Sequence, residues 1–241
     1  MGQAGPLSWR AGRGWIILVG GGELEDTLDI HRAAIEAMSD EAPVVYVPAA
    51  SARPDAGRER GQLVVEQMEE LGGPVGYVAP IFARADAGDP KNVRRLTQAG
   101  LVYLGDGSAQ KLAETLAVPG AAVPSDAGHS TAALDALTAA FAAGAVIVAE
   151  GEAACALGAW GLGADGVIRA GWDWLPDTLI RPSFDDAAAT ALRNAIKSKP
   201  ACLGMGIPRG VALALGPENQ VQTLSASGQQ VTVVLGPKFR A

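Results

Sequence analysis

Short apolar runs alternate with amphipathic segments along the first two thirds of the chain. The apolar runs are typical of strands buried on both faces of a parallel sheet; they lie at 15–19, 44–47, 75–78, 101–104 and 145–148. Apolar residues at helical spacing predict the segments between and after them to be helices; these cover 26–38, 56–71, 89–99, 109–116 and 131–143. The alternation predicts an α/β protein with a doubly wound, mostly parallel sheet and right-handed crossovers.

The pattern changes after residue 160. Residues 161–176 are rich in glycine and tryptophan, and a helix is predicted over 185–197. Short strands separated by turn-forming residues follow; they lie at 201–206, 211–215, 220–224 and 230–235. We expect these strands to form an antiparallel C-terminal meander on the same sheet, within a single domain that covers 15–241 after a flexible tail at 1–14.

Composition and charge narrow the function classes. The net charge of −7 and the lack of a basic run argue against a nucleic acid partner. No apolar run approaches the roughly 20 residues that span a bilayer, and no apolar block near the start resembles a signal peptide, so we expect a cytoplasmic protein without a membrane partner. Cys155 and Cys202 lie in segments predicted to be core, which favours buried thiols. No His, Cys or Asp spacing matches a ligand set, so neither a metal nor a cofactor is expected.

Three glycine-rich turns directly follow predicted strands, at 20–22, 105–107 and 151–153. The carboxyl ends of parallel strands meet at one edge of a sheet, where ligands bind, so we expect these turns to crowd one rim. The first turn is not a dinucleotide-binding fingerprint, because Leu24 and Glu25 stand where its last glycine belongs. The third turn, from a buried strand into small helix-forming residues, is typical of an elbow that carries a nucleophile.

Four motifs occur in order along nearly the whole chain: LVGGGE at 18–23, VYLGDGS at 102–108, GEAACA at 151–156 and LGMGIPRGVA at 203–212. A fifth segment, WLP at 174–176 followed by 178–184, precedes the last of them. Together they resemble the motifs of the peptidase E/cyanophycinase family of serine peptidases. The resemblance implies a class I glutamine amidotransferase-like fold with a flavodoxin-like core, and hydrolysis of peptide or amide bonds.

The positions that carry the family's chemistry hold other residues here. The resemblance places the nucleophilic serine at Ala153, the histidine at Ser183 and the acidic residue at Arg209, with Arg181 two residues before Ser183. A methyl group cannot be acylated, and a serine hydroxyl is no base near neutral pH. We therefore expect a pseudoenzyme that acts by binding a small ligand or by assembly. Its vestigial pocket would be formed by Gly20, Gly21, Gly22, Gly105, Asp106, Gly107, Gly151, Glu152 and Ala154.

Three alternatives stay open at this point. First, the hydrolase would stay active with a relocated nucleophile, which could be Cys155, or Ser125 or Ser130 near His129. Cys155, however, lies two residues past the elbow position, which is a rotation of roughly 200° around a helix. The guanidinium groups of Arg181 and Arg209 would suit an anionic ligand, and Asp106 would suit a cation or an amine. Trp172 and Trp174 fit either a homodimer contact or the core.

Overall fold

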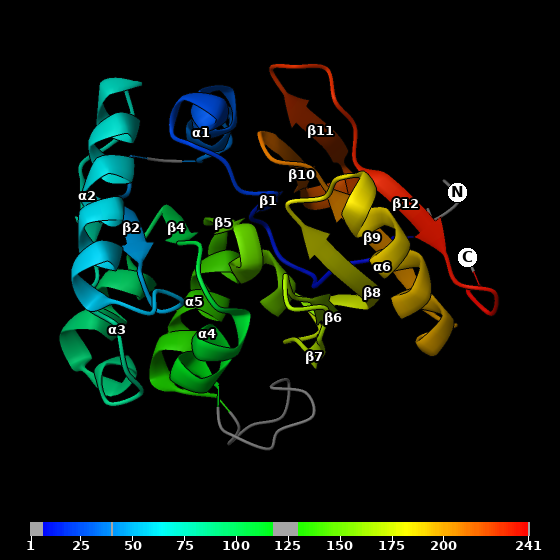
Figure 1. Ribbon diagram of the computed structural model, residues 1–241. Coiled ribbons are helices and arrows are strands. Elements are labelled where there is room, and N and C mark those ends of the chain that lie inside the picture. Colours follow the sequence, from blue (N-terminus) through cyan, green and yellow to red (C-terminus); the bar gives the residue numbers. More distant parts are fainter. Residues whose placement is uncertain (1–6, 40, 118–129, 241) are drawn as a thin grey trace.

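The computed structural model describes residues 7–39, 41–117 and 130–240, which fold around two sheets (Figure 1). The larger sheet has the strand order β11-β10-β1-β5-β4-β2-β3. Its five parallel strands are β1 (Ile16–Val19), β2 (Val44–Val47), β3 (Gly76–Val78), β4 (Leu101–Leu104) and β5 (Val146–Glu150). The strands β10 (Val211–Leu215) and β11 (Val221–Ser225) extend it in antiparallel fashion beside β1.

The parallel strands alternate with helices that cover both faces of the larger sheet. The helices α1 (Leu28–Glu36) and α2 (Pro54–Glu70) cover one face, where their side chains pack against the strand residues Ile17, Tyr103 and Val148. The opposite face is covered by α3 (Pro90–Thr97), α4 (Ala109–Leu116) and α5 (Ala132–Ala143). Successive residues of each strand enter opposite faces, which explains why the buried strands β1, β2 and β4 are apolar throughout. The predicted doubly wound fold is confirmed.

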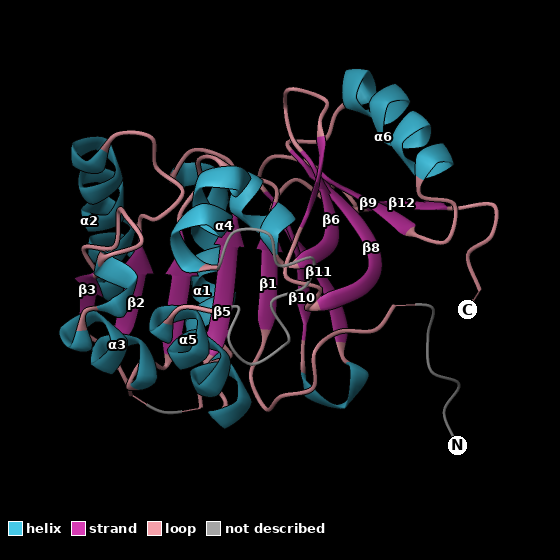
Figure 2. Ribbon diagram, turned by 90° about the horizontal axis from the view of Figure 1, so that it is seen from below, coloured by secondary structure: helices cyan, strands magenta, loops and turns pink. Residues whose placement is uncertain are grey.

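A second sheet of five strands has the order β12-β9-β8-β6-β7. It contains β6 (Gly158–Leu162), β7 (Ile168–Ala170), β8 (Leu175–Pro182), β9 (Leu203–Ile207) and β12 (Thr232–Leu235). The helix α6 (Asp186–Ser198) connects β8 to its parallel neighbour β9 and packs against β9 and β12 (Figure 2). Short 3-10 turns complete the described part: η1 (Glu25–Thr27), η2 (Asp86–Gly88), η3 (Gly151–Ala156) and η4 (Pro217–Asn219).

The C-terminal half differs from the expected single meander. The antiparallel strands β10 and β11 do extend the larger sheet, but β9 and β12 belong to the second sheet. The strands β6, β7 and β8 were not predicted, and the residues after the elbow form only the short η3 turn before β6 begins at Gly158. The expectation that one sheet holds every C-terminal strand is therefore wrong.

Two further expectations are settled by packing. Residues 7–14 are not a loose tail, because Leu7 and Trp9 pack against the core and the Arg10 amide donates to the Trp174 carbonyl at 2.6 Å; residues 1–6 lie outside the described part. Trp172 and Trp174 are each 2% exposed within this one chain. They are core residues, so they offer no surface for a homodimer.

Candidate functional site

The three glycine turns meet at the carboxyl ends of β1, β4 and β5. A methyl group added at Gly21 would lie 3.7 Å from the Gly151 Cα and 4.0 Å from the Asp106 Oδ2. β5 lies between β1 and β4 in the sheet, with Val19 paired to Glu150 and Leu104 paired to Ala149. The topology therefore brings Gly20, Gly21, Gly22, Gly105, Asp106, Gly107, Gly151 and Glu152 to one rim, as the sequence predicted.

The sharp bend of the elbow lies at Gly151. This residue directly follows β5 and has a φ of +57°, in the left-handed region where L side chains are strained. A nucleophile elbow places its reactive residue at such a strained turn between strand and helix. Ala153 and Ala154 lie beyond the bend, inside η3, and are completely buried in the core. The structure thus corrects the expectation that the Ala153 methyl points from the crest of the bend into a cavity: the crest is at 151, and it carries no side chain.

The Asp106 carboxylate occupies the space that a side chain at position 151 would need. A Cβ added at Gly151 would collide with the Asp106 carboxyl group. The Asp106 Oδ1 accepts hydrogen bonds from the Gly107 amide at 2.6 Å and from the Glu152 amide at 2.9 Å. Burial raises the pKa of Asp106, and these two amides offset the rise only in part. Backbone amides beside an elbow are the groups that stabilise an oxyanion in acyl transfer, and here a carboxylate of the chain itself binds them.

Ser183 lies on the same rim, directly after β8. Its amide and its hydroxyl both donate to the Gly20 carbonyl, at 2.9 and 3.1 Å, and its φ of +47° is unusual for a residue with a side chain. Its Oγ lies 3.6 Å from a methyl group added at Gly21. The structure therefore places position 183 beside the Gly151 bend, with a hydroxyl and no base.

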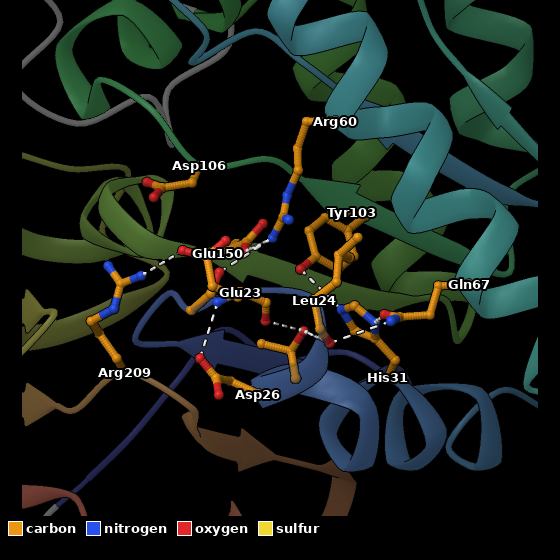
Figure 3. Close-up of polar contacts among 12 residues, drawn as sticks. Glu23, Leu24, Asp26, His31, Arg60, Gln67, Tyr103, Asp106, Glu150 and Arg209 are labelled. Atoms are coloured by element: carbon orange, nitrogen blue, oxygen red, sulfur yellow. Dashed lines mark hydrogen bonds and ion pairs between the residues drawn. The ribbon is translucent and has the colours of Figure 1, made fainter.

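The two arginines proposed for an anion are engaged elsewhere. The Arg209 Nη2 lies 3.3 Å from the Glu23 Oε1 in an exposed ion pair (Figure 3). The Arg181 Nη1 donates to the Leu162 carbonyl at 3.3 Å, and its Nε is buried without a partner. In the described residues each guanidinium group thus has its own partner within the chain, and the proposed anion site stays a prediction.

The residues considered for a relocated nucleophile lie apart from the rim or outside the described part. Cys155 is 3% exposed, its thiol faces the Ile180 carbonyl at 3.5 Å, and burial raises its pKa to about 12. A thiol with that pKa is almost entirely protonated near neutral pH, so it is a poor nucleophile. The Ser130 hydroxyl donates to Asp135 at the start of α5. Ser125 and His129 fall in 118–129, outside the described residues.

A buried ion pair that the sequence analysis missed lies directly behind the elbow. Glu150, the last residue of β5, is 1% exposed, and its Oε1 lies 2.8 Å from the Arg60 Nη2 on α2. Burial raises the pKa of Glu150, while Arg60 opposes the rise. The other oxygen, Oε2, is buried without a hydrogen-bond partner. A glutamate that ends an apolar strand was the available signal, because a buried carboxylate requires a cation.

A chain of buried polar groups lies next to this ion pair (Figure 3). Gln67 on α2 donates its amide to the Leu24 carbonyl at 3.3 Å, so its Oε1 faces the His31 Nδ1 at 2.5 Å and accepts the proton. The His31 Nε2 then accepts from the Tyr103 hydroxyl at 3.2 Å. Burial lowers the pKa of His31 to about 4, so the ring is neutral at physiological pH. The network fixes α1 and α2 to β4 and leaves this histidine fully buried.

Across residues 7–39, 41–117 and 130–240, no group of three or more His, Cys, Asp or Glu side chains is arranged to hold a metal ion. Within those same limits, every helix is too short or too polar to cross a bilayer.

The comparison with solved structures finds proteins of the same fold. Neither a protein-family model nor a curated protein matches the chain. Among solved structures, a peptidase from an acI-B1 Actinobacterium superposes with a TM-score of 0.70 at 19% identity, over 92% of this chain and 94% of that one. A putative peptidase E protein from Listeria monocytogenes EGD-e gives a TM-score of 0.54 at 14% identity, over 88% of this chain and 98% of that one. The chain therefore has a peptidase E-like fold.

Proposed function

We propose that the chain is a peptidase E-like protein that has lost acyl-transfer chemistry and acts by binding rather than by hydrolysis. The observation that carries this proposal is the Asp106 carboxylate at the elbow. It binds the amides of Gly107 and Glu152, next to a residue that has no side chain. A negative group there competes with any oxyanion, and no nucleophile stands at the bend.

The residues around the elbow support the same proposal. The resemblance places the family's base at Ser183, whose hydroxyl donates to the Gly20 carbonyl. A serine hydroxyl is no base near neutral pH. The resemblance places the acidic member of the triad at Arg209, which pairs with Glu23 and cannot stabilise an imidazolium.

Hydrolase assays test the proposal. Purified protein would be incubated with aspartyl dipeptides, β-aspartyl-arginine fragments and activated esters, beside its Cys155→Ala, His129→Ala and Asp106→Asn variants. We expect the wild type to show no turnover above the uncatalysed rate and the three variants to match it. Turnover that any of these substitutions abolishes would overturn the proposal and, for Cys155 or His129, identify the relocated chemistry.

A further inference from the structure

A cleft of about 540 Å³ opens beside the rim, at one end of the second sheet. Ser183 of the rim forms part of its wall, so the cleft borders the elbow site. Its lining includes Ser183, Asp186, Arg209, Gln229, Gln230 and Thr232. None of the cleft residues belongs to the Asp106 contact described above.

The topology places this cleft where parallel sheets bind ligands. The strands β8 and β9 are parallel and are connected through α6, so the carboxyl ends of both strands and the start of α6 lie together (Figure 1). β12 runs antiparallel to β9, with Thr232 opposite Gly206, and brings the 229–232 segment to the same end. A crevice outside the carboxyl ends of parallel strands is the usual ligand position in such folds.

The cleft carries charges of both signs on different elements. Arg209 comes from the turn between β9 and β10, and its side chain is 58% exposed. Its ion pair with the exposed Glu23 contributes little, typically below about 1 kcal/mol, so a ligand carboxylate can replace Glu23. Asp186, in the first turn of α6, has no hydrogen bond or ion pair to another side chain in the described part of the chain.

The rest of the wall is mixed: Phe184 and Pro208 are apolar, Asp185 uses its carboxylate to cap α6 through the Ala188 amide, and the other groups are polar and uncharged. The carboxamides of Gln229 and Gln230 and the hydroxyl of Thr232 line the cleft, and they supply both donors and acceptors. The Gln230 side-chain amide donates to the Gly228 carbonyl at 3.4 Å, and an apolar ligand would offer no partner to the other groups. A ligand of one charge sign would match only one of Arg209 and Asp186.

We propose that this cleft binds a small zwitterion, a molecule with a carboxylate and an ammonium group joined by a short chain. Its carboxylate binds Arg209, its ammonium group binds Asp186, and the carboxamides contact the chain between them. This inference rests on the proposed function, which is binding without hydrolysis, and it names the class of ligand that is bound. A site that does not hydrolyse its ligand releases it unchanged.

Calorimetric titration tests the inference with defined probes. The zwitterions are glycine, γ-aminobutyrate and ε-aminohexanoate, which bracket the separation of the two charges; butyrate and butylamine represent the two halves of γ-aminobutyrate. We expect one zwitterion to bind, and each half to bind at least about tenfold more weakly, as the loss of one charged contact implies. Arg209→Gln and Asp186→Asn should each weaken the zwitterion at least about tenfold, whereas Arg193→Gln, an exposed arginine of α6 outside the cleft, should leave its binding unchanged.

Four results would overturn the inference. Butyrate that binds as tightly as the zwitterion would show an anion site, and butylamine that does so would show a cation site. A lack of heat change with every probe, or equal weakening by Arg193→Gln, would show that the cleft is not the zwitterion site. These calorimetric results concern binding alone. The hydrolase assays measure turnover, so they test the proposed function independently.

Discussion

At the scale of single residues, Gly151 and Asp106 share one space at the elbow. Gly151 has no side chain, and the neighbouring strand end supplies Asp106, whose carboxyl group fills the space that a Cβ at 151 would need. Each residue therefore constrains what the other position accepts. This pairing is visible only in the structure, because 45 residues separate the two positions (151 − 106) in the sequence.

The pairing predicts coupled effects on stability. Gly151→Ala should lower the free energy of unfolding by about 2–3 kcal/mol, because it adds backbone strain at positive φ and a collision with Asp106. In the Asp106→Gly background the collision is absent, so the same change should cost only the strain, about 1 kcal/mol. Urea unfolding of the wild type, both single variants and the double variant measures the coupling energy. Additive effects would show that the two residues do not compete for one space.

The motif alignment and the backbone disagree by two positions, for a physical reason. Ala153 lies two residues after Gly151, as the serine of the family motif lies two residues after its glycine. The amino-acid sequence does not show, however, which residue of the turn adopts the strained conformation. The φ of +57° assigns that role to Gly151, where glycine is the residue with the lowest conformational penalty. Sequence alone predicted the rim and the three turns, but it placed the crest of the bend wrongly.

At the scale of elements, strands that are buried on both faces were predictable and irregular ones were not. The bounds of β2 and β4 match the apolar runs at 44–47 and 101–104. β8 contains Pro176 and Pro182, and Asp177 within it has a φ of +53°, so it has neither a continuous apolar run nor clean alternation. β6 begins with a glycine and shifts register against β8 between Gly158 and Trp160. Tertiary pairing, which local pattern does not encode, creates these strands.

The network that connects α1, α2 and β4 predicts a pH dependence of stability. The pKa of His31 is about 4 in the folded protein, against 6.5 for the unperturbed group, so between these values the unfolded chain binds a proton that the native ring excludes. The free energy of unfolding should therefore rise with pH across this window and lose the His31 contribution as pH falls from 6.5 to 4. The shift corresponds to about 3 kcal/mol over the full window.

Comparison with a variant isolates this contribution from other groups. The raised pKa values of Glu150 and Asp106 act in the opposite direction, because their folded forms favour protonation. The measured quantity is the difference in free energy of unfolding between pH 7 and pH 4.5, in the wild type and in His31→Gln. We expect the variant to lose less stability on acidification than the wild type does. An identical loss in both proteins would contradict the role assigned to His31.

At the scale of the whole molecule, the N-terminal segment joins the two sheets. The Gly14 amide donates to the Phe141 carbonyl on α5 at 3.1 Å, and the Arg10 amide donates to Trp174, at the start of the second sheet. The Arg10 guanidinium lies 5.3 Å from the centre of the Trp174 ring, which in turn lies 5.2 Å from Phe141. Leu7 and Trp9 are partly buried and pack against the core cluster to which Phe141 and Trp174 belong. Residues 7–14, for which the sequence pattern predicted no helix or strand, thus contact both the larger sheet's helix α5 and the start of β8 in the second sheet.

Removal of this segment should weaken the whole fold rather than one end of it. Deletion of residues 1–11 uncovers part of the Trp174 and Phe141 surface and removes the partly buried Leu7 and Trp9, which should cost about 2–4 kcal/mol at ordinary values for apolar burial. Urea unfolding followed by circular dichroism measures the loss, and deletion of residues 1–6, which removes none of the contacts described above, is the matched control. We expect a single cooperative transition at lower urea for the longer deletion, because the segment contacts both sheets and its loss is felt by the common core. Two separate transitions would mean that the sheets unfold independently once the segment is gone, and an unchanged midpoint would mean that residues 7–11 contribute nothing to the junction.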